Sequence, residues 1–373
     1  MAAQEFVKEL LRRYYVGCEV AVPALAQREF GFGFESKIDY RHKAFASGRE
    51  FNEFLRREAP LYASYSTARY SMPAARPMSR KGSLGTDLVF DLDKTYEAEH
   101  PEAHNAIACE KCLDRSKEDA LRFLEEFLLN DFGFGKQDVS VNYSGSKGFH
   151  FHVRTEAVQQ LSSFARKQLC DYAGAFEVSG GTLLESIGEG KAGVLRGPAG
   201  GDGGWRGKFH SVALEIARNA AQEELQKKGL TKKKAEAFVE KRDAIAGALA
   251  KGNWDYLPWL ADFWRAIGDE VVRTHRVELD KPVTFDMARL IRIPGTIHGT
   301  TGLVAKPVDN LAKFEPLKDA LAFTGRERQA LVCDHDVSFD FGGQTLDVRA
   351  GARVELPLSA ALLLYCKGVA KPA

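Results

Sequence analysis

The segment at 139–153, VSVNYSGSKGFHFHV, constrains the fold of this chain more than any other. Its two halves alternate side chains with the period of two that is typical of strands, and a glycine-containing centre joins them. On the second half, Phe149 and Phe151 share one face. His150 and His152 share the opposite face. We therefore predict strand, turn and strand, with both histidines on one side of a sheet.

Helical and strand patterns flank this segment on both sides. Residues 86–93 (TDLVFDLD) predict an apolar strand, and residues 28–46 predict a β-hairpin. Residues 118–133 (EDALRFLEEFLLNDFG) have the apolar spacing of a helix. The tail at 331–365 predicts a β-rich segment with a final short helix. The fold class predicted from this mixture is α/β (α+β).

The domain organisation follows from a change of pattern in the second half of the chain. Residues 188–208 hold nine glycines, which favours a loop or an insertion boundary. A highly charged helical block follows at 210–250, and strand patterns return after 277. We predict a core at 1–200 and 270–373, interrupted by a mainly helical insertion at 200–270.

Charge and cysteine usage exclude several classes of protein. The 373 residues include 52 Lys and Arg against 51 Asp and Glu, so a globally basic nucleic-acid coat is excluded, although a local basic groove is not. The six cysteines are dispersed and make no secreted disulfide framework. No apolar stretch approaches the roughly 20 residues that span a bilayer. We expect an intracellular protein with no membrane partner.

The acids Asp91 and Asp93 end the strand at 86–93. Side chains two apart on a strand project to the same face, and two carboxylates so placed repel each other unless a divalent cation lies between them. Their hard oxygen ligands suit Mg²⁺ or Mn²⁺. The same Asp-x-Asp pattern also occurs where a strand simply runs into a polar loop, so both interpretations stand.

The turn between the strands at 139–153 has the composition of an anion site. Its two glycines let the backbone approach a ligand, Ser144 can donate a hydrogen bond, and Lys147 adds a charge. His150 follows on the next strand. The alternative is an ordinary hairpin turn with two exposed histidines. The spacing is not that of the GxxxxGK[ST] phosphate loop.

A third constellation lies between Asp280 and Lys306. It includes RLIRIPGTIH at 289–298, so that Arg292 and His298 stand close to Pro and Gly turns. Such a set can clamp a triphosphate. The alternative is a surface hairpin whose charges pair with one another.

A fourth constellation has the ligand types of a closed zinc site. His100, His104, Cys109 and Cys112 offer two imidazoles and two thiolates within about 98–115. The alternative is a reduced pair of surface cysteines.

The order of these motifs resembles that of the small catalytic subunit of the archaeal and eukaryotic type of DNA primase, in the archaeo-eukaryotic primase superfamily. The resemblance covers about 28–310 and is carried most specifically by SGSKGFHFHV and RLIRIPGTIHG. REFGF at 28–32 and Tyr40-Arg41 resemble the opening segment of the family. The resemblance favours an archaeal member.

The resemblance implies a primase catalytic core with an RRM-like sheet, a small zinc knuckle and a helical insertion. It implies a nucleotidyltransferase that synthesises short RNA primers de novo on single-stranded DNA by two-metal transfer, and it leaves dNTP use open. The implied partners are a large primase subunit, the DNA template, NTPs and the replication machinery, in the cytoplasm or nucleoid. The implied residues are Asp91, Asp93 and Asp280 for Mg²⁺ or Mn²⁺; Ser144, Lys147, His150, Arg292, His298, Lys306 and Arg41 for the nucleotide; and His100, His104, Cys109 and Cys112 for structural Zn²⁺.

Three other functions remain open at this point. A related polymerase for end joining or translesion repair would share the motifs. A metal-dependent hydrolase or glycosyltransferase would use only the Asp-x-Asp pair, and a non-catalytic nucleic-acid module would use none of the carboxylates. The lysines at 227–234 indicate either a solvated helix face or a template-binding patch. The near-zero net charge predicts weak DNA affinity for the isolated chain.

Overall fold

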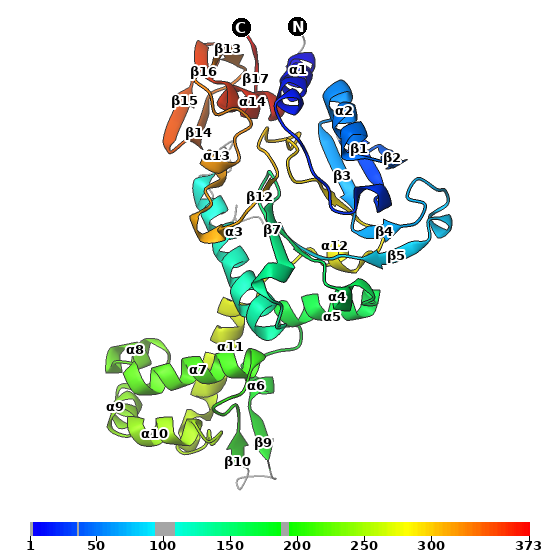
Figure 1. Ribbon diagram of the computed structural model, residues 1–373. Coiled ribbons are helices and arrows are strands. Elements are labelled where there is room, and N and C mark those ends of the chain that lie inside the picture. The colour runs from blue at the N-terminus through cyan, green and yellow to red at the C-terminus, as the bar shows by residue number, and fades with distance from the viewer. Residues whose placement is uncertain (1–2, 36, 94–108, 188–193) are drawn as a thin grey trace. The chain divides into compact units, whose positions relative to one another are not determined.

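The computed structural model describes residues 3–35, 37–93, 109–187 and 194–373 (Figure 1). By its internal contacts the chain divides into two compact units. The first unit comprises 1–124, 134–170 and 279–373, and the second comprises 125–133 and 171–278. Within the described ranges, no helix has both the length and the apolar character needed to cross a membrane.

The first unit mixes helices and strands, which confirms the predicted fold class. Its helices are α1 (Ala3–Val16), α2 (Gly48–Glu58), α3 (Glu110–Arg122), α4 (Glu156–Gln159), most of α5 (Ser163–Ala173), α12 (Lys281–Phe285), α13 (Pro316–Asp319) and α14 (Leu358–Cys366), with short 3₁₀ turns η1 (Leu25–Gln27), η2 (Met78–Arg80), η6 (Lys136–Asp138) and η9 (Leu311–Lys313). Its strands are β1 (Phe30–Gly33), β2 (Tyr40–Lys43), β3 (Tyr62–Ser66), β4 (Ala68–Tyr70), β5 (Ser83–Thr86), β6 (Leu88–Leu92), β7 (Val139–Tyr143), β8 (Phe149–Val153), β11 (Leu290–Arg292), β12 (Lys306–Pro307), β13 (Arg328–Cys333), β14 (Val337–Phe341), β15 (Gln344–Val348), β16 (Arg353–Pro357) and β17 (Ala370–Pro372).

Two antiparallel four-stranded sheets organise this unit. The strand order is β11-β3-β1-β2 in the first sheet and β12-β7-β8-β6 in the second. The pairs β1–β2 and β7–β8 confirm the predicted hairpins at 28–46 and 139–153. In the second sheet Asp91 lies directly opposite His150, so the register places an acid beside a histidine. An RRM-like sheet stays a prediction.

Aromatic packing joins α2 to the first sheet. The Ser47 side chain caps the helix by accepting a hydrogen bond of 3.2 Å from the Glu50 N–H, which satisfies an otherwise unpaired donor. Phe51 is buried and its ring lies 5.0 Å from that of Phe30. The same core takes in α1 and the C-terminal helix α14, whose residues are apolar around the whole helix. The β-rich tail and final helix predicted at 331–365 are therefore confirmed.

The helix predicted at 118–133 is longer and less regular than its sequence pattern. It begins at Glu110 as α3, and it changes after Arg122 into a π-helical segment, η5 (Phe123–Asp131). Its first two turns were not predicted because they carry mostly polar residues. The Phe123 ring lies 5.1 Å from that of Phe90 and 5.0 Å from that of Phe151. This packing covers the apolar face of the second sheet and leaves Asp91 and His150 on the other face.

The second unit is mainly helical. It contains α6 (Gly180–Leu183), α7 (Gly204–Asn219), α8 (Gln222–Lys227), α9 (Lys232–Glu240), α10 (Arg242–Leu249), η8 (Pro258–Leu260), α11 (Ala261–His275), most of η5 and the strands β9 (Glu185–Ile187) and β10 (Val194–Arg196). Its core is aromatic, with the Trp254 ring 4.6 Å from Phe209 and 5.5 Å from Trp264. The predicted insertion at 200–270 falls inside this unit and, as a domain, stays a prediction.

Candidate functional site

Three carboxylates predicted as metal ligands come from two distant segments of the first unit. Asp91 is the fourth residue of β6, and Asp93 follows the strand end. Asp280 is the residue before α12, and its N–H donates a hydrogen bond of 2.8 Å to the carbonyl oxygen of Asp91. The start of α12 is thereby fixed to the end of β6, which brings the third acid to the first two.

The electrostatics of this group reflect that proximity. Burial raises the pKa of Asp91 to about 8, and the charges of Asp93 and Asp280 add to the rise. Burial also raises the pKa of Asp93, while the Lys147 ammonium opposes that rise. Asp91 Oδ1 is buried and accepts no hydrogen bond from the described residues, although His150 Nε2 lies 3.5 Å away. The carboxylates are close enough to repel one another in their charged forms.

As the side chains are placed, no three His, Cys, Asp or Glu residues in the described part of the chain gather closely enough to hold a metal ion. The donor chemistry nevertheless fits Mg²⁺ or Mn²⁺, because it consists of carboxylate oxygens. Asp91 Oδ1 is a buried acceptor that a hard cation would satisfy.

The turn at 144–148, called here the Ser144 turn, is held together by the Ser144 side chain. Ser144 Oγ accepts hydrogen bonds of 3.2 Å from the N–H groups of Ser146 and Gly148. A Cβ at Gly148 would lie 1.9 Å from the Leu92 carbonyl oxygen, so the turn packs directly on the end of β6. This contact accounts for the effect of the exposed Lys147 on Asp93. Ser144 thus orders the turn.

A second cluster contains Arg292, His298 and Tyr62. The Arg292 guanidinium carbon lies 5.6 Å from the centre of the Tyr62 ring, and the His298 ring lies 6.2 Å from it. Arg292 Nη1 is buried and donates no hydrogen bond within the described residues. Burial lowers the pKa of Arg292 to about 10, so the guanidinium remains charged at neutral pH. The Nη1 group of Arg292 can therefore donate a hydrogen bond to an anionic ligand.

Both histidines near this cation are neutral at physiological pH. Burial lowers the pKa of His150 to about 3, and the Arg292 charge lowers it further. Burial lowers the pKa of His298 to about 2, with Arg292, Lys367 and His150 adding to the effect. These mutual effects show that Arg292, His150 and His298 share one electrostatic environment. Neutral imidazoles there can donate one N–H each.

The His298 loop and the Ser144 turn are packed together. The Thr301 hydroxyl donates a hydrogen bond to the Gly145 carbonyl oxygen. A Cβ at Gly145 would lie 2.9 Å from His298 Cβ, and Gly145 has a φ of +81°, so glycine is favoured for two reasons. The segments predicted separately at 144–150 and 289–298 are therefore brought together.

Lys306 and Arg41 have other partners in the structure. Lys306 Nζ donates a hydrogen bond of 2.7 Å to the Asp319 carbonyl oxygen. Arg41 Nε donates a hydrogen bond of 3.1 Å to Glu29, a fully buried acid that also lies 3.3 Å from Lys81 Nζ. Their nucleotide roles stay predictions.

The structure describes two of the four residues that were predicted to bind zinc. Cys109 precedes α3, and its Sγ accepts a hydrogen bond of 3.4 Å from the Cys112 N–H. Cys109 therefore caps the helix, and Cys112 lies in its first turn. The other two predicted ligands, His100 and His104, lie outside the described residues.

Sequence reasoning missed several residues that shape this site. Tyr62 contacts both Arg292 and His298, but one tyrosine in a strand gives no signal of this. His152 was predicted only to share a strand face with His150, with exposure of both histidines as the alternative; it is fully buried, and its ring stacks on that of Tyr65 with the ring centres 6.4 Å apart. The ion pair between Arg28 and Asp87, with an N–O distance of 2.7 Å, is also fully buried, and Asp87 is the residue directly before β6. No local signal identifies this pair, because Arg28 lies between Gln27 and Glu29 and Asp87 follows Thr86.

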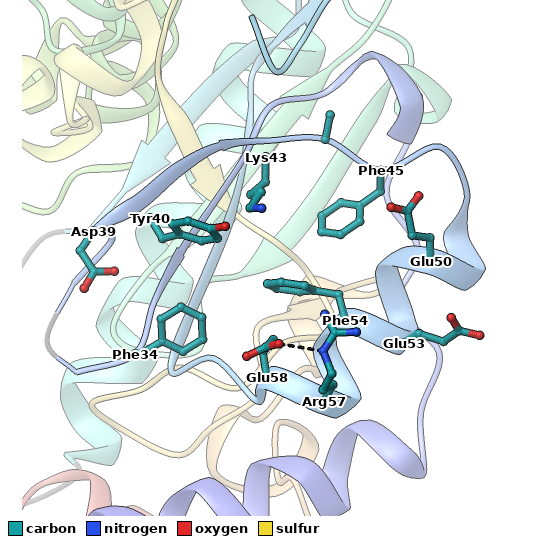
Figure 2. Close-up of a pocket in the computed structure, with 11 residues that line it drawn as sticks. Phe34, Asp39, Tyr40, Lys43, Phe45, Glu50, Glu53, Phe54, Arg57 and Glu58 are labelled. Atoms are coloured by element: carbon teal, nitrogen blue, oxygen red, sulfur yellow. Dashed lines mark hydrogen bonds and ion pairs between the residues drawn. The ribbon is translucent and has the colours of Figure 1, made fainter. Parts of the chain in front are cut away.

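A hollow of about 760 Å³ lies apart from these residues, between β2 and α2 (Figure 2). Figure 2 shows the rings of Phe34, Tyr40 and Phe54 on its walls, with the Arg57–Glu58 ion pair of 2.7 Å at one side. None of the predicted site residues lines it. It is therefore distinct from the carboxylate site.

Comparison with known proteins supplies the family context. A family profile described as DNA primase small subunit matches residues 90–310. The chain is 34% identical to the DNA primase small subunit PriS of Methanothrix thermoacetophila, over 98% of each chain. It is 32% identical to PriS of Methanococcoides burtonii, over 98% of this chain and 97% of that one. It is also 32% identical to PriS of Halorubrum lacusprofundi, over 99% and 98% respectively.

Proposed function

Since the chain belongs to the DNA primase small subunit family, whose function is primer synthesis in DNA replication, we propose that it synthesises primers by nucleotidyl transfer at Asp91, Asp93 and Asp280. The observation that carries this proposal is the fixed position of Asp280 against Asp91, through the hydrogen bond of 2.8 Å between their backbones. Three acids from segments far apart in sequence thereby converge where Lys147 and His150 also act electrostatically.

The carboxylates would hold two Mg²⁺ or Mn²⁺ ions, with Asp91 Oδ1 as one of the ligating oxygens. Bound there, such ions would activate a 3′-hydroxyl and stabilise the charge that develops on pyrophosphate. The protein's contribution is to keep the acids in place without a nucleophile of its own. Catalysis then depends on positioning and on electrostatics.

The basic residues would bind the triphosphate from two sides. Lys147 stands on the Ser144 turn beside Asp93, and Arg292 presents its buried Nη1 from β11. Neutral His150 and His298 would donate hydrogen bonds to phosphate oxygens. Ser144 would act by shaping the turn. Lys306 and Arg41 are weaker candidates because their side chains already donate hydrogen bonds to protein atoms.

Further parts of the proposal concern structure and partners. Cys109 and Cys112, with His100 and His104, would hold a structural Zn²⁺, and the region at 200–270 would form the helical insertion. A large primase subunit would supply much of the affinity for single-stranded DNA. Zinc content measured on the intact chain and on Cys109→Ser tests the first of these points, since loss of about one zinc per chain is expected.

The proposed activity is tested by comparing the products formed on different DNA templates and from different nucleotide donors. With labelled NTPs, the chain and its large subunit should make short products on unprimed single-stranded DNA. Products from supplied primers or from gapped, 5′-phosphorylated breaks alone would instead assign a repair polymerase. Incorporation from sugar nucleotides in place of NTPs would assign a glycosyltransferase.

A further inference from the structure

The second unit presents a concentrated group of lysines at the junction of two helices. Five lysines occur between 227 and 234, where α8 ends and α9 begins. Lys228 is paired with Glu270 at 3.0 Å, but the other four are exposed. They are Lys227, Lys232, Lys233 and Lys234.

An aromatic ring borders these lysines. Lys234 Nζ lies 5.4 Å from the centre of the Trp259 ring, which belongs to the short turn η8 and is half-buried. Three residues earlier, Tyr256 is 45% exposed. We call the four exposed lysines and Trp259 the lysine–tryptophan surface.

The acids of the same two helices are placed elsewhere. Glu223 and Glu224 stand in the first turn of α8, at the other end of that helix from Lys227. Glu236 accepts a hydrogen bond of 3.4 Å from Gln222, and Glu240 ends α9. The first turn of α9 contains no acid. Positive charge therefore accumulates at the helix junction although the whole chain has a net charge of only +1.

The lysines at the start of α9 are unfavourable for the helix dipole. Cations are disfavoured at a helix N-terminus, where the helix dipole is positive, and acids are the usual choice there. Lys232, Lys233 and Lys234 occupy that turn, and Thr231 already caps it by accepting from the Lys234 N–H. An anionic partner would offset both the mutual repulsion of the lysines and their conflict with the dipole.

We propose that the lysine–tryptophan surface binds single-stranded DNA, with phosphates at the lysines and a base stacked on Trp259. This inference rests on the proposed function, which requires a DNA template. Lysines that follow a phosphate backbone, beside a ring that accepts any base, are the combination used for sequence-independent binding of single strands. An acidic protein would use the lysines but would have no comparable need of the ring.

The test measures binding of a fluorescent 20-nucleotide oligo-dT to the full chain by anisotropy, across a series of salt concentrations starting low. For Lys232→Gln/Lys233→Gln, we expect weaker binding and a salt slope, log Kobs against log salt, that is shallower by about 1.4, because each phosphate contact to a single strand contributes about 0.7. The matched control is Lys37→Gln/Lys313→Gln, which removes two exposed lysines of the first unit and should leave the slope unchanged.

Trp259 gives the second, charge-independent readout. Trp259→Ala should weaken binding by about ten-fold without changing the salt slope, because it removes one stacked base and no charge. Trp259→Phe keeps a ring and should recover most of the affinity. Thermal unfolding of each variant shows whether its fold is kept.

Three results would overturn the proposal. The first is that the wild type shows no measurable binding of oligo-dT at low salt. The second is that the salt slope is the same for both pairs of lysine substitutions. The third is that the lysine variants bind oligo-dT like the wild type and lose only their binding of the large subunit. Primer synthesis on the same oligo-dT separates this outcome from failure of the proposed function. If the enzyme synthesises primers but its affinity for DNA is unchanged by these substitutions, this inference alone is contradicted.

Discussion

The backbone N–H of Asp280 donates a hydrogen bond of 2.8 Å to the carbonyl oxygen of Asp91. One residue precedes α12 and the other lies on β6, so the bond joins the late part of the chain to its first acidic strand. Asp280 thereby stands close enough for its charge to act on Asp91. The convergence of three acids is a property of the tertiary fold.

Gly148→Ala tests the packing of the Ser144 turn against β6. The added Cβ would lie 1.9 Å from the Leu92 carbonyl oxygen, so the backbone must move. We expect a loss of roughly 1–3 kcal/mol in the free energy of unfolding, measured with denaturant, together with reduced incorporation. The control is Gly48→Ala, where an added Cβ meets nothing within 4 Å. Equal stability of the two variants would refute the close approach.

Arg292→Gln tests the buried cation. Its Nη1 has no hydrogen-bond partner within the described residues, so we expect it to bind a triphosphate oxygen. Loss of a charged hydrogen bond should raise KM for NTPs by about ten-fold or more, with a smaller effect on kcat.

The matched substitution is Lys306→Gln. Because Lys306 Nζ is bonded to the Asp319 carbonyl oxygen, its loss should change KM by less than about three-fold. The prediction fails if Lys306→Gln impairs NTP binding more than Arg292→Gln does.

Asp87→Asn tests the buried charges beneath β6. Asp87 accepts hydrogen bonds from Arg28 at 2.7 Å and from Arg154 at 3.2 Å, and both Asp87 and Arg28 are fully buried. Removing one charge leaves the Arg28 guanidinium uncompensated, so we expect a loss of about 3–5 kcal/mol in unfolding free energy. Glu53→Gln breaks the exposed Arg49–Glu53 pair and should reduce the unfolding free energy far less, because solvent screens that pair. Similar losses would argue against the buried pair.

His152 predicts a dependence of stability on pH. Burial holds the pKa of His152 well below its usual value, and neither ring nitrogen has a hydrogen-bond partner among the described residues. In the unfolded chain His152 is protonated below about pH 6.5, whereas in the folded chain it stays neutral. The free energy of unfolding therefore keeps its full value above that pH and falls as the pH drops.

His152→Phe removes that proton. Below pH 6.5 the variant should lose stability less steeply than the wild type, by up to about 1.4 kcal/mol per pH unit. Denaturant unfolding at pH 7.5, 6 and 5 measures this difference. Parallel curves for the two proteins would show that His152 is protonated in the folded state.

Local patterns predicted some parts of the site and long-range pairing decided the rest. Asp91 beside Asp93, and His150 beside His152, follow from the period of two on single strands. That His152 is buried depends instead on Tyr65, which belongs to the other sheet. No local pattern specifies such a contact.

The nucleotide residues show the same division. Arg292 meets Tyr62 because β11 pairs with β3, and the Thr301–Gly145 bond joins two loops that are distant in sequence. Lys306 was grouped with Arg292 by proximity in sequence, whereas its ammonium group turns to the Asp319 carbonyl oxygen. Sequence identified the chemical groups, but only the fold could say which of them meet.

The most direct test of the account is synthesis on unprimed single-stranded DNA with labelled NTPs and Mg²⁺ or Mn²⁺, comparing the wild type with Asp93→Ala, each with and without the large subunit. We predict short products from the wild type and a loss of at least about 100-fold in Asp93→Ala, with its fold unchanged. Full activity of Asp93→Ala, or no incorporation by folded, metal-supplied wild type with its partner, would contradict nucleotidyl transfer at these carboxylates.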